Sequence, residues 1–200
     1  METWQIRGGT LEYFDEEHIY LYEGVQLPSV TQILSNKWRN EFANIPRAVL
    51  TRASERGTNV HMAVEKYCKH GFDDGSQEVR NFKFLQKTYG FEVLDNELPV
   101  VIFDNDVAVA CGRLDLTLEM NGEIGIGDIK TNSALNKEKI ALQLNLYRLG
   151  LRDSYGVDAK FLKVIHIRDD VRKMIDLPIN EEFTYEILHE YLERAQNEQS

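Results

Sequence analysis

The chain has 200 residues, 42% of them hydrophobic, and a formal net charge of −10 at pH 7. This length and apolar fraction predict one folded domain over residues 1–200 and exclude an intrinsically disordered chain. No apolar run approaches the roughly 20 residues of a membrane-spanning helix, so no membrane partner is expected.

The N-terminus and the cysteines indicate where the protein works. The first residues, METWQIRGGT, lack the apolar core of a secretory signal and the basic pattern of a transit peptide. Cys68 and Cys111 are far apart in sequence and form no CxxC pair, so both are expected to be free thiols. We therefore expect a cytoplasmic protein of a bacterial or phage-infected cell.

The N-terminal part, residues 1–90, is predicted to contain a hairpin followed by helices. Ser29 and Ser76 are suitable N-caps, and Gly90 can end a helix in a left-handed conformation. The predicted elements are a hairpin over 10–22 with its turn at 15–17, a short helix from Ser29 to about 36, and helices over 46–69 and 76–89.

Residues 91–200 change character and are predicted to form the core sheet. Strands are expected over 97–104, 107–119, 123–130, 161–168 and 171–178, and helices over 136–153 and 183–196. This order favours an α/β (α+β) fold with a central mixed β-sheet flanked by helices and an N-terminal helical part.

The dipeptide Asn121-Gly122 is the strongest short-range signal for a two-residue type I′ hairpin turn. Such a turn places residues whose numbers sum to 243 opposite each other. It gives two facing pairs on one face, Asp115 with Asp128 and Arg113 with Lys130. The other face then carries the apolar side chains that would point into a core, namely Leu114, Leu116, Leu118 and Ile129.

Two carboxylates on opposed residues lie only about 5 Å apart and repel each other. A divalent cation would relieve this repulsion, because Mg²⁺ prefers oxygen ligands and accepts one or two carboxylates with water and phosphate. Lys130 could then orient or deprotonate a metal-bound water. A solvated charged surface on an ordinary hairpin explains the same residues equally well.

This hairpin resembles the PD-(D/E)XK nuclease superfamily, in which an Asp on one strand and a D/E-x-K on the next hold the metal. The matching residues here are Asp115 and the segment Asp128-Ile129-Lys130, and Thr131 completes the usual D-x-K-T. The resemblance implies a restriction-endonuclease-like core.

The flanking helices are similar to those of the RecB-like branch of the superfamily. Gly57 and His61 match a G-x-x-x-H helix whose His is a metal ligand, and Gln143 and Tyr147 match a Q-x-x-x-Y helix that contacts the DNA backbone. The segment 28–31, PSVT, resembles mitochondrial genome-maintenance exonucleases and related phage nucleases. Taken alone, these residues would read as a polar helix face, a partly buried helix and a capped helix start.

The resemblance implies a full set of site residues. His61, Asp115, Asp128 and the Ile129 carbonyl would hold one or two Mg²⁺ or Mn²⁺ ions, with Lys130 and Glu65 assisting catalysis. DNA contacts are expected from Ser29, Thr31, Arg113, Thr131, Gln143 and Tyr147. Relatives with an iron–sulfur cluster use four cysteines, and two separated cysteines predict no such cluster here.

The function that the resemblance implies is a metal-dependent DNA exonuclease acting on single-stranded or processed ends. Its setting would be phage or bacterial DNA recombination, repair or replication, with DNA as the partner and a recombinase, single-strand-binding protein or helicase as further candidates. The net charge argues against DNA binding, but residues 37–56 carry five basic against two acidic side chains, and residues 130–173 ten against five.

Other functions remain open on the sequence. A nuclease fold without turnover could bind DNA or protein, and the same core could serve an endonuclease or an RNA-directed enzyme. The sequence does not decide cleavage polarity, strand preference or oligomeric state.

Overall fold

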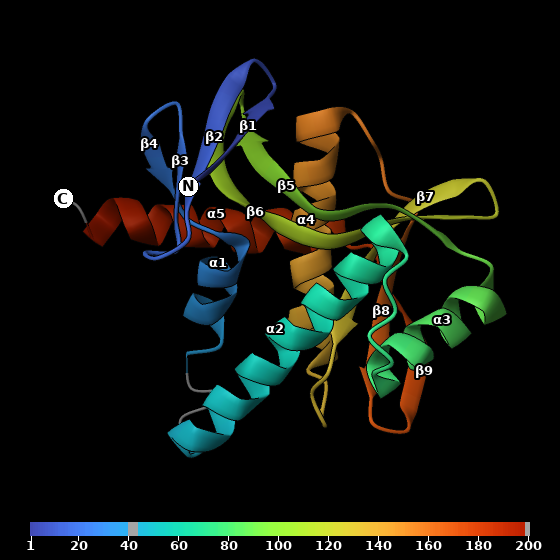
Figure 1. Ribbon diagram of the computed structural model, residues 1–200. Helices are drawn as coiled ribbons and strands as arrows, with labels where there is room; N and C mark the ends of the chain where they lie inside the picture. The colour runs from blue at the N-terminus through green and yellow to red at the C-terminus, as the bar shows by residue number, and fades with distance from the viewer. Residues whose placement is uncertain (40–43, 199–200) are drawn as a thin grey trace.

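The central element of the fold is a mixed five-stranded sheet, seen in a computed structural model that describes residues 1–39 and 44–198. Its strands are adjacent in chain order: β5 (Glu92–Asp104), β6 (Val107–Met120), β7 (Glu123–Lys130), β8 (Phe161–Arg168) and β9 (Val171–Leu177). All neighbours are antiparallel except β7 and β8, which are parallel. The parallel pair requires a crossover, and helix α4 (Lys137–Tyr155) provides it. The predicted mixed sheet is confirmed (Figure 1).

The N-terminal hairpin proves to be half of a second sheet. This sheet has four antiparallel strands in chain order: β1 (Glu2–Ile6), β2 (Gly9–Phe14), β3 (Ile19–Tyr22) and β4 (Val25–Leu27). The predicted strands β2 and β3 are confirmed, whereas β1 and β4 were not predicted. β4 has only three residues, and β1 joins β2 through Arg7 and Gly8, both with positive φ, a turn that the sequence hardly signals.

The helices follow the predicted boundaries closely. They are α1 (Val30–Lys37), α2 (Arg47–His70), α3 (Gln77–Tyr89), α4 and α5 (Glu181–Glu198). Ser29 and Ser76 cap α1 and α3 as expected, and Gly90 ends α3 with a left-handed φ of 65°. Residues 40–43, part of the predicted basic stretch, lie outside the described residues. None of the described helices is both long enough and apolar enough to cross a membrane.

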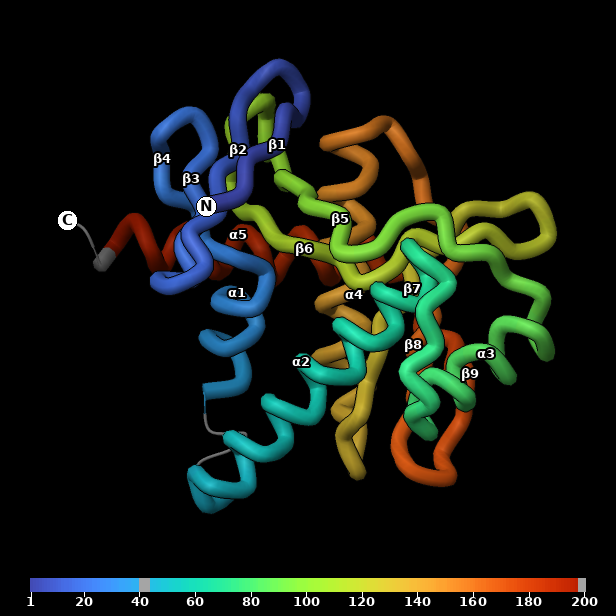
Figure 2. Tube along the Cα trace, viewed as in Figure 1, coloured from blue at the N-terminus to red at the C-terminus, as the bar shows by residue number. Residues whose placement is uncertain are grey.

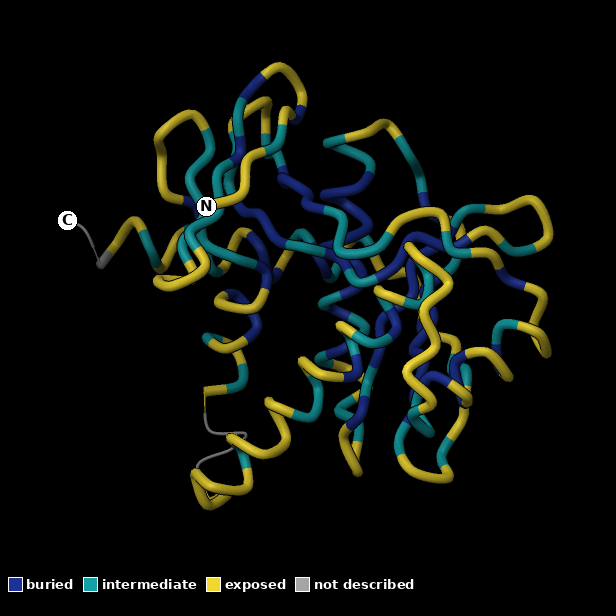
Figure 3. Tube along the Cα trace, in the orientation of Figure 1, coloured by how far each residue is buried: buried dark blue, intermediate teal, exposed yellow. Residues whose placement is uncertain are grey.

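Helices cover both faces of the central sheet (Figures 1 and 2). One apolar cluster joins side chains of α1, α4 and α5 with the sheet, and a second joins α2 and α3 with the other face. The burial pattern agrees, because buried residues run through the sheet and α4 while the outer half of α2 is mostly exposed (Figure 3). Most of the strands β6 and β7 therefore lie inside the protein, and the turn at Asn121-Gly122 is exposed.

Candidate metal centre

The Asn121-Gly122 turn sets the register of the hairpin as predicted. Both residues have positive φ, 56° and 80°, as a type I′ turn requires. The paired residues run from Met120 with Glu123 to Leu116 with Gly127, and each pair sums to 243.

The ladder ends just before the predicted pairs, so two expectations need correction. Asp115 is not paired with Asp128 across the ladder; instead, its Oδ2 accepts the Ile129 backbone N–H at 2.8 Å. Beyond Gly127, β7 is paired only with β8. An aspartate side chain thus replaces the strand-to-strand hydrogen bond at the point where the two strands separate.

Arg113 does not face Lys130. Its guanidinium lies over the rings of Trp4 and Tyr13, 5.0 and 5.1 Å from their centroids, and 3.0 Å from the Glu2 carboxylate. The N-terminal sheet, whose packing the sequence did not predict, therefore determines where this arginine points.

The alternation of β6 breaks at Asp115. Leu114 packs in the cluster with α4, whereas Leu116 packs in the cluster with α2 and α3, although residues i and i+2 of a regular strand share a face. The opposite position on β5 is Glu97, whose φ of 52° is left-handed, a rare conformation for a residue with a side chain. Irregularities of this kind re-aim side chains, and here they bring two carboxylates toward α2.

Three potential metal ligands converge at this break. The Nδ1 atom of His61 on α2 lies 3.6 Å from Glu97 Oε1 and 3.6 Å from Asp115 Oδ2. One ligand atom from each of these residues lies within 4.8 Å of the other two. The predicted residues His61 and Asp115 are brought together, and Glu97 joins them.

Sequence reasoning missed Glu97 for a definite reason. Counting back from the turn between β5 and β6, where Asp104 pairs with Val107, would place Asn96 opposite Asp115. A bulge between Ala108 and Ala110 leaves Val109 of β6 unpaired, shifts the pairing by one residue and puts Glu97 there. Such a shift depends on packing, and no local pattern indicated it.

The imidazole of His61 is held in one orientation. Its Nε2 donates to the Ile129 carbonyl at 3.0 Å, so Nδ1 faces the two carboxylates. Burial would lower the pKa of His61, but the negative charge of Asp115 and the contact with Glu97 outweigh it and raise the pKa to about 9. The carboxylates of Glu97 and Asp115 therefore stabilise a positive charge on the His61 imidazole.

Asp128 and Lys130 form a buried ion pair beside this group. The Lys130 ammonium lies 2.8 Å from Asp128 Oδ1 and 2.7 Å from Oδ2, and 3.3 Å from Gln143 Oε1. Burial raises the pKa of Asp128, although Lys130 opposes this effect, and the nearby charge of Asp115 adds to it. Burial would lower the pKa of Lys130, but the carboxylates of Asp128 and Asp115 raise it, so the amine stays protonated.

The residues present fit a divalent cation. Only 1% of Asp128 is exposed, and its buried Oδ2 has no hydrogen-bond partner among the described residues, despite its closeness to the ammonium. Carboxylate oxygens suit both Mg²⁺ and Mn²⁺, and the imidazole nitrogen favours Mn²⁺ over Mg²⁺. His61, Glu97 and Asp115 could hold such an ion, and the Ile129 carbonyl contacts His61. Asp128, which was also predicted as a ligand, falls outside this group of three and pairs with Lys130 instead.

Glu65 is not part of this group. It lies one turn after His61 on α2, but its Oε1 bonds the Lys69 ammonium at 2.6 Å. Both His61 and Glu65 line a hollow of about 510 Å³, together with Glu97 and Arg113. Glu97, rather than Glu65, therefore takes the position beside the histidine.

The residues predicted to contact DNA have varied surroundings. Ser29 uses its hydroxyl and its N–H in a capping box with Gln32, while Thr31 is exposed in the first turn of α1. Thr131 is buried beside α2, where a Cβ on Gly57 would come within 3.8 Å of its Oγ1.

Gln143 and Tyr147 differ in exposure. Tyr147 is 5% exposed and packs against Gly112, where a Cβ would come within 2.8 Å of the ring. Burial raises its pKa, and its side chain hydrogen-bonds that of Gln143. Gln143 lines a second hollow, of about 260 Å³, with Lys130. Tyr147 thus supports Gln143 from inside the core, and Gln143 contacts Lys130.

The comparisons with known proteins add little. No family model and no curated protein sequence matches the chain. The chain is similar to a solved structure described as "Crystal structure of SSO0001", with 16% sequence identity and a TM-score of 0.45 over 82% of this chain and 74% of that one. A likeness this loose carries no argument about function.

Proposed function

We propose that the protein is a metal-dependent DNA nuclease whose ion is held by His61, Glu97 and Asp115. The observation that carries the proposal is the convergence of these three side chains within 4.8 Å, from three separate elements, beside the buried Asp128–Lys130 pair. Bringing the three side chains together requires an irregularity in β6 and a left-handed backbone conformation at Glu97, which costs free energy. Such strain is typical of functional sites, and a purely structural cluster would not need it.

A divalent cation bound here would activate a water molecule and offset charge that develops on a phosphate. The Ile129 carbonyl lies beside His61, and the charges of Asp115 and His61 act on the Asp128 carboxylate, so both would add oxygen atoms near the ion. The carbonyl now accepts from His61, and the Asp115 carboxylate accepts from the Ile129 N–H, so the backbone of β7 fixes both side chains in place.

Lys130 acts as a cation in this proposal and not as a base, because its neighbours raise its pKa. Its ammonium donates to Asp128 and to Gln143 and retains a third N–H for a water or a phosphate oxygen. Gln143 keeps the amine directed toward the hollow that both residues line. Mg²⁺ and Mn²⁺ are the ions that this donor set favours.

DNA as the substrate and cleavage from an end are supported by the resemblance to RecB-like PD-(D/E)XK nucleases. The motifs run in that family's order from Pro28 to Tyr147, and the structure adds Glu97 to them. Arg47 and Arg52 on α2 are exposed basic side chains on an acidic chain and could contact phosphates. A nuclease fold without turnover and an endonuclease remain the alternatives.

End-labelled single- and double-stranded DNA, incubated with Mn²⁺, Mg²⁺ or EDTA, tests the proposal. We expect metal-dependent cleavage that falls roughly 100-fold or more in Lys130→Met, the size typical of removing one charge-stabilising donor. Lys163→Met is the matched control, because Lys163 is also a buried strand lysine, paired with Asp176 away from the site.

The outcomes separate the candidates. Absence of cleavage with any ion, or equal losses in the two lysine variants, would contradict the enzyme proposal. Circular single-stranded DNA distinguishes the modes of attack, since an exonuclease leaves it intact and an endonuclease opens it. DNA binding without cleavage would favour the silent binding factor.

A further inference from the structure

A hollow near the proposed centre lies between the N-terminal half of α2 and the loop that follows β7. Its volume is about 660 Å³, within the range of small-molecule pockets. Figure 2 shows this loop running beside the N-terminal half of α2. The loop is anchored, because His166 on β8 bonds the Asn132 carbonyl at 2.8 Å.

This hollow adjoins the surroundings of Lys130. Thr131, the residue after Lys130, lines it directly. The smaller hollow that contains Lys130 and Gln143 shares four lining residues with it, Asn132, Ala134, Leu135 and Asn136. A molecule that reached the proposed centre could therefore extend around this loop into the larger hollow.

Part of the wall of the hollow is apolar, and of these side chains Leu135 also packs against the core. Val49, Leu50 and Ala53 face it from α2, and Ala134 and Leu135 face it from the loop. Val49 is 52% exposed, and it is not among the buried side chains of α2, which in the described residues are Val60 and Val64. Apolar side chains in an exposed concave surface are typical of a ligand site.

Arginines line the same hollow. Arg56 and Arg168 are both paired with Asp169, and Arg56 also bonds Glu78 at 2.6 Å. Arg52 lines the hollow too and makes no hydrogen bond or ion pair with the residues that the structure describes. Since the chain as a whole carries a net charge of −10, an unpaired cation over an apolar wall indicates an anionic ligand with an apolar part.

We propose that this hollow binds one nucleotide unit of the strand next to the scissile phosphate. Its phosphate would bind Arg52, and its base would lie on the apolar wall formed by Val49 and Leu135. This inference rests on the proposed function, because the position of the hollow beside the one around Lys130 is what favours a polynucleotide as the occupant.

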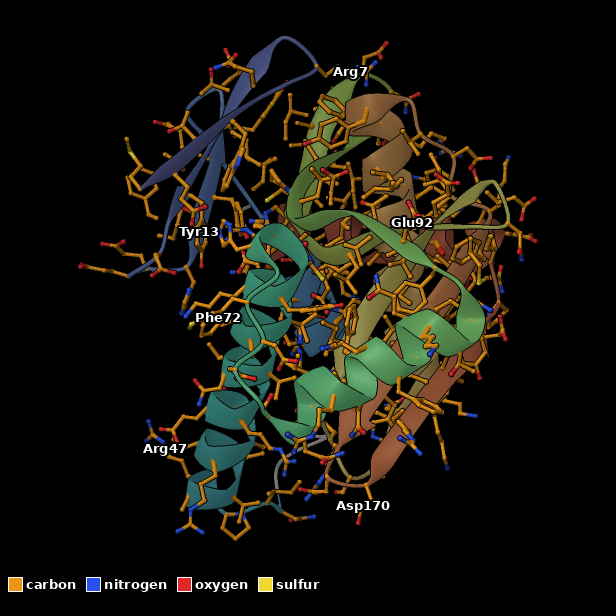
Figure 4. The ribbon with its side chains drawn as sticks, turned by 45° about the vertical axis from the view of Figure 1, so that its right-hand side comes forward. Arg7, Tyr13, Arg47, Phe72, Glu92 and Asp170 are labelled. Carbon is orange, nitrogen blue, oxygen red and sulfur yellow. The ribbon has the colours of Figure 1, made fainter. Side chains whose placement is uncertain are left out.

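Binding of deoxyadenosine monophosphate in EDTA, measured by calorimetry and by NMR shifts of the Ala53 and Ala134 amides, tests the site without any turnover. We expect Arg52→Glu to weaken binding at least about tenfold, as loss of a partly exposed charge-assisted contact does. Arg47→Glu is the matched control: Arg47 lies on the same helix, at its outer end and outside the lining (Figure 4), and its reversal changes the net charge equally.

The two parts of the nucleotide are tested separately. Val49→Ser should weaken the mononucleotide and leave inorganic phosphate unaffected, whereas Arg52→Glu should weaken both. Equal affinities in wild type and Arg52→Glu, or shifts that avoid Ala53 and Ala134, would overturn the subsite. If the protein binds the mononucleotide as expected but cleaves no DNA, the subsite is supported and the nuclease proposal is contradicted. If it cleaves DNA but fails these binding tests, the nuclease proposal is supported and the subsite is contradicted.

Discussion

Replacing Glu97 by Gln should weaken divalent-ion binding without unfolding the protein. Glu97 is partly exposed and lies 3.6 Å from the His61 Nδ1 atom, so the substitution removes its charge and preserves its shape. If Glu97 is a ligand, the ion loses one anionic oxygen and keeps an amide oxygen in its place. If Glu97 is only a surface acid, ion binding should hardly change.

The size of the effect follows from the geometry. Two unit charges about 4 Å apart interact by about 4 kcal/mol at the effective dielectric constant of 20 that suits partly buried sites. The amide oxygen can still coordinate the ion, so we take about half of this value, about 2 kcal/mol, as lost. At 1.4 kcal/mol for each factor of ten, the Mn²⁺ affinity should fall about 30-fold.

Titration calorimetry with Mn²⁺ at constant pH and low salt measures this loss, with thermal melting as a check on folding. The matched control is Glu65→Gln, because Glu65 lines the same hollow but is paired with Lys69. The ligand assignment would be refuted if Glu97→Gln bound Mn²⁺ like the wild type, and most clearly if Glu65→Gln lost the ion instead.

Three further predictions concern stability. Gly112→Ala should lower the free energy of unfolding by about 1–3 kcal/mol in urea titrations, because the new Cβ would lie 2.8 Å from the buried Tyr147 ring; an unchanged midpoint would contradict this packing. Gly122→Ala should cost about 1 kcal/mol in the same assay, since Gly122 has a φ of 80° and nothing within 4 Å of an added Cβ, so the cost is conformational and not steric. Glu181 joins Arg152 and Arg148 at 2.8 and 2.9 Å, and these hydrogen bonds lower its pKa from 4.5. Its stabilisation is therefore complete above pH 4.5 and is lost as the pH falls through the lower folded pKa. Because this carboxylate is 40% exposed, Glu181→Gln should cost less than about 1 kcal/mol at pH 7, and melting temperatures should converge with wild type in acid.

Local signals in the sequence were enough for most of the elements. The serine caps, the glycine stops and the Asn121-Gly122 turn act within a few residues, so they predicted helix ends and the hairpin register correctly. The strand β4 was missed because it has only three residues, and β1 was missed because the turn at Arg7 and Gly8 that joins it to β2 gives little local signal. Short strands gain their stability from the sheet and carry little signal of their own.

The opposition of Asp115 and Asp128 shows where such reasoning fails. The turn determines pairing only as far as Leu116 and Gly127, and beyond them the Asp115 side chain takes the Ile129 N–H. Arg113 was expected beside Lys130 but stacks on Trp4 and Tyr13, which belong to a sheet about a hundred residues earlier in the chain.

The sequence by itself determined the order of the elements, the register of the β6–β7 hairpin and the candidate residues His61, Asp115, Asp128 and Lys130. Only the tertiary structure decided that Glu97 stands beside His61 and that Glu65 does not. The physical reason is that no local pattern of residues specifies the one-residue shift in the pairing of β5 with β6 or the left-handed backbone at Glu97. Both are stabilised by packing from both faces of the sheet.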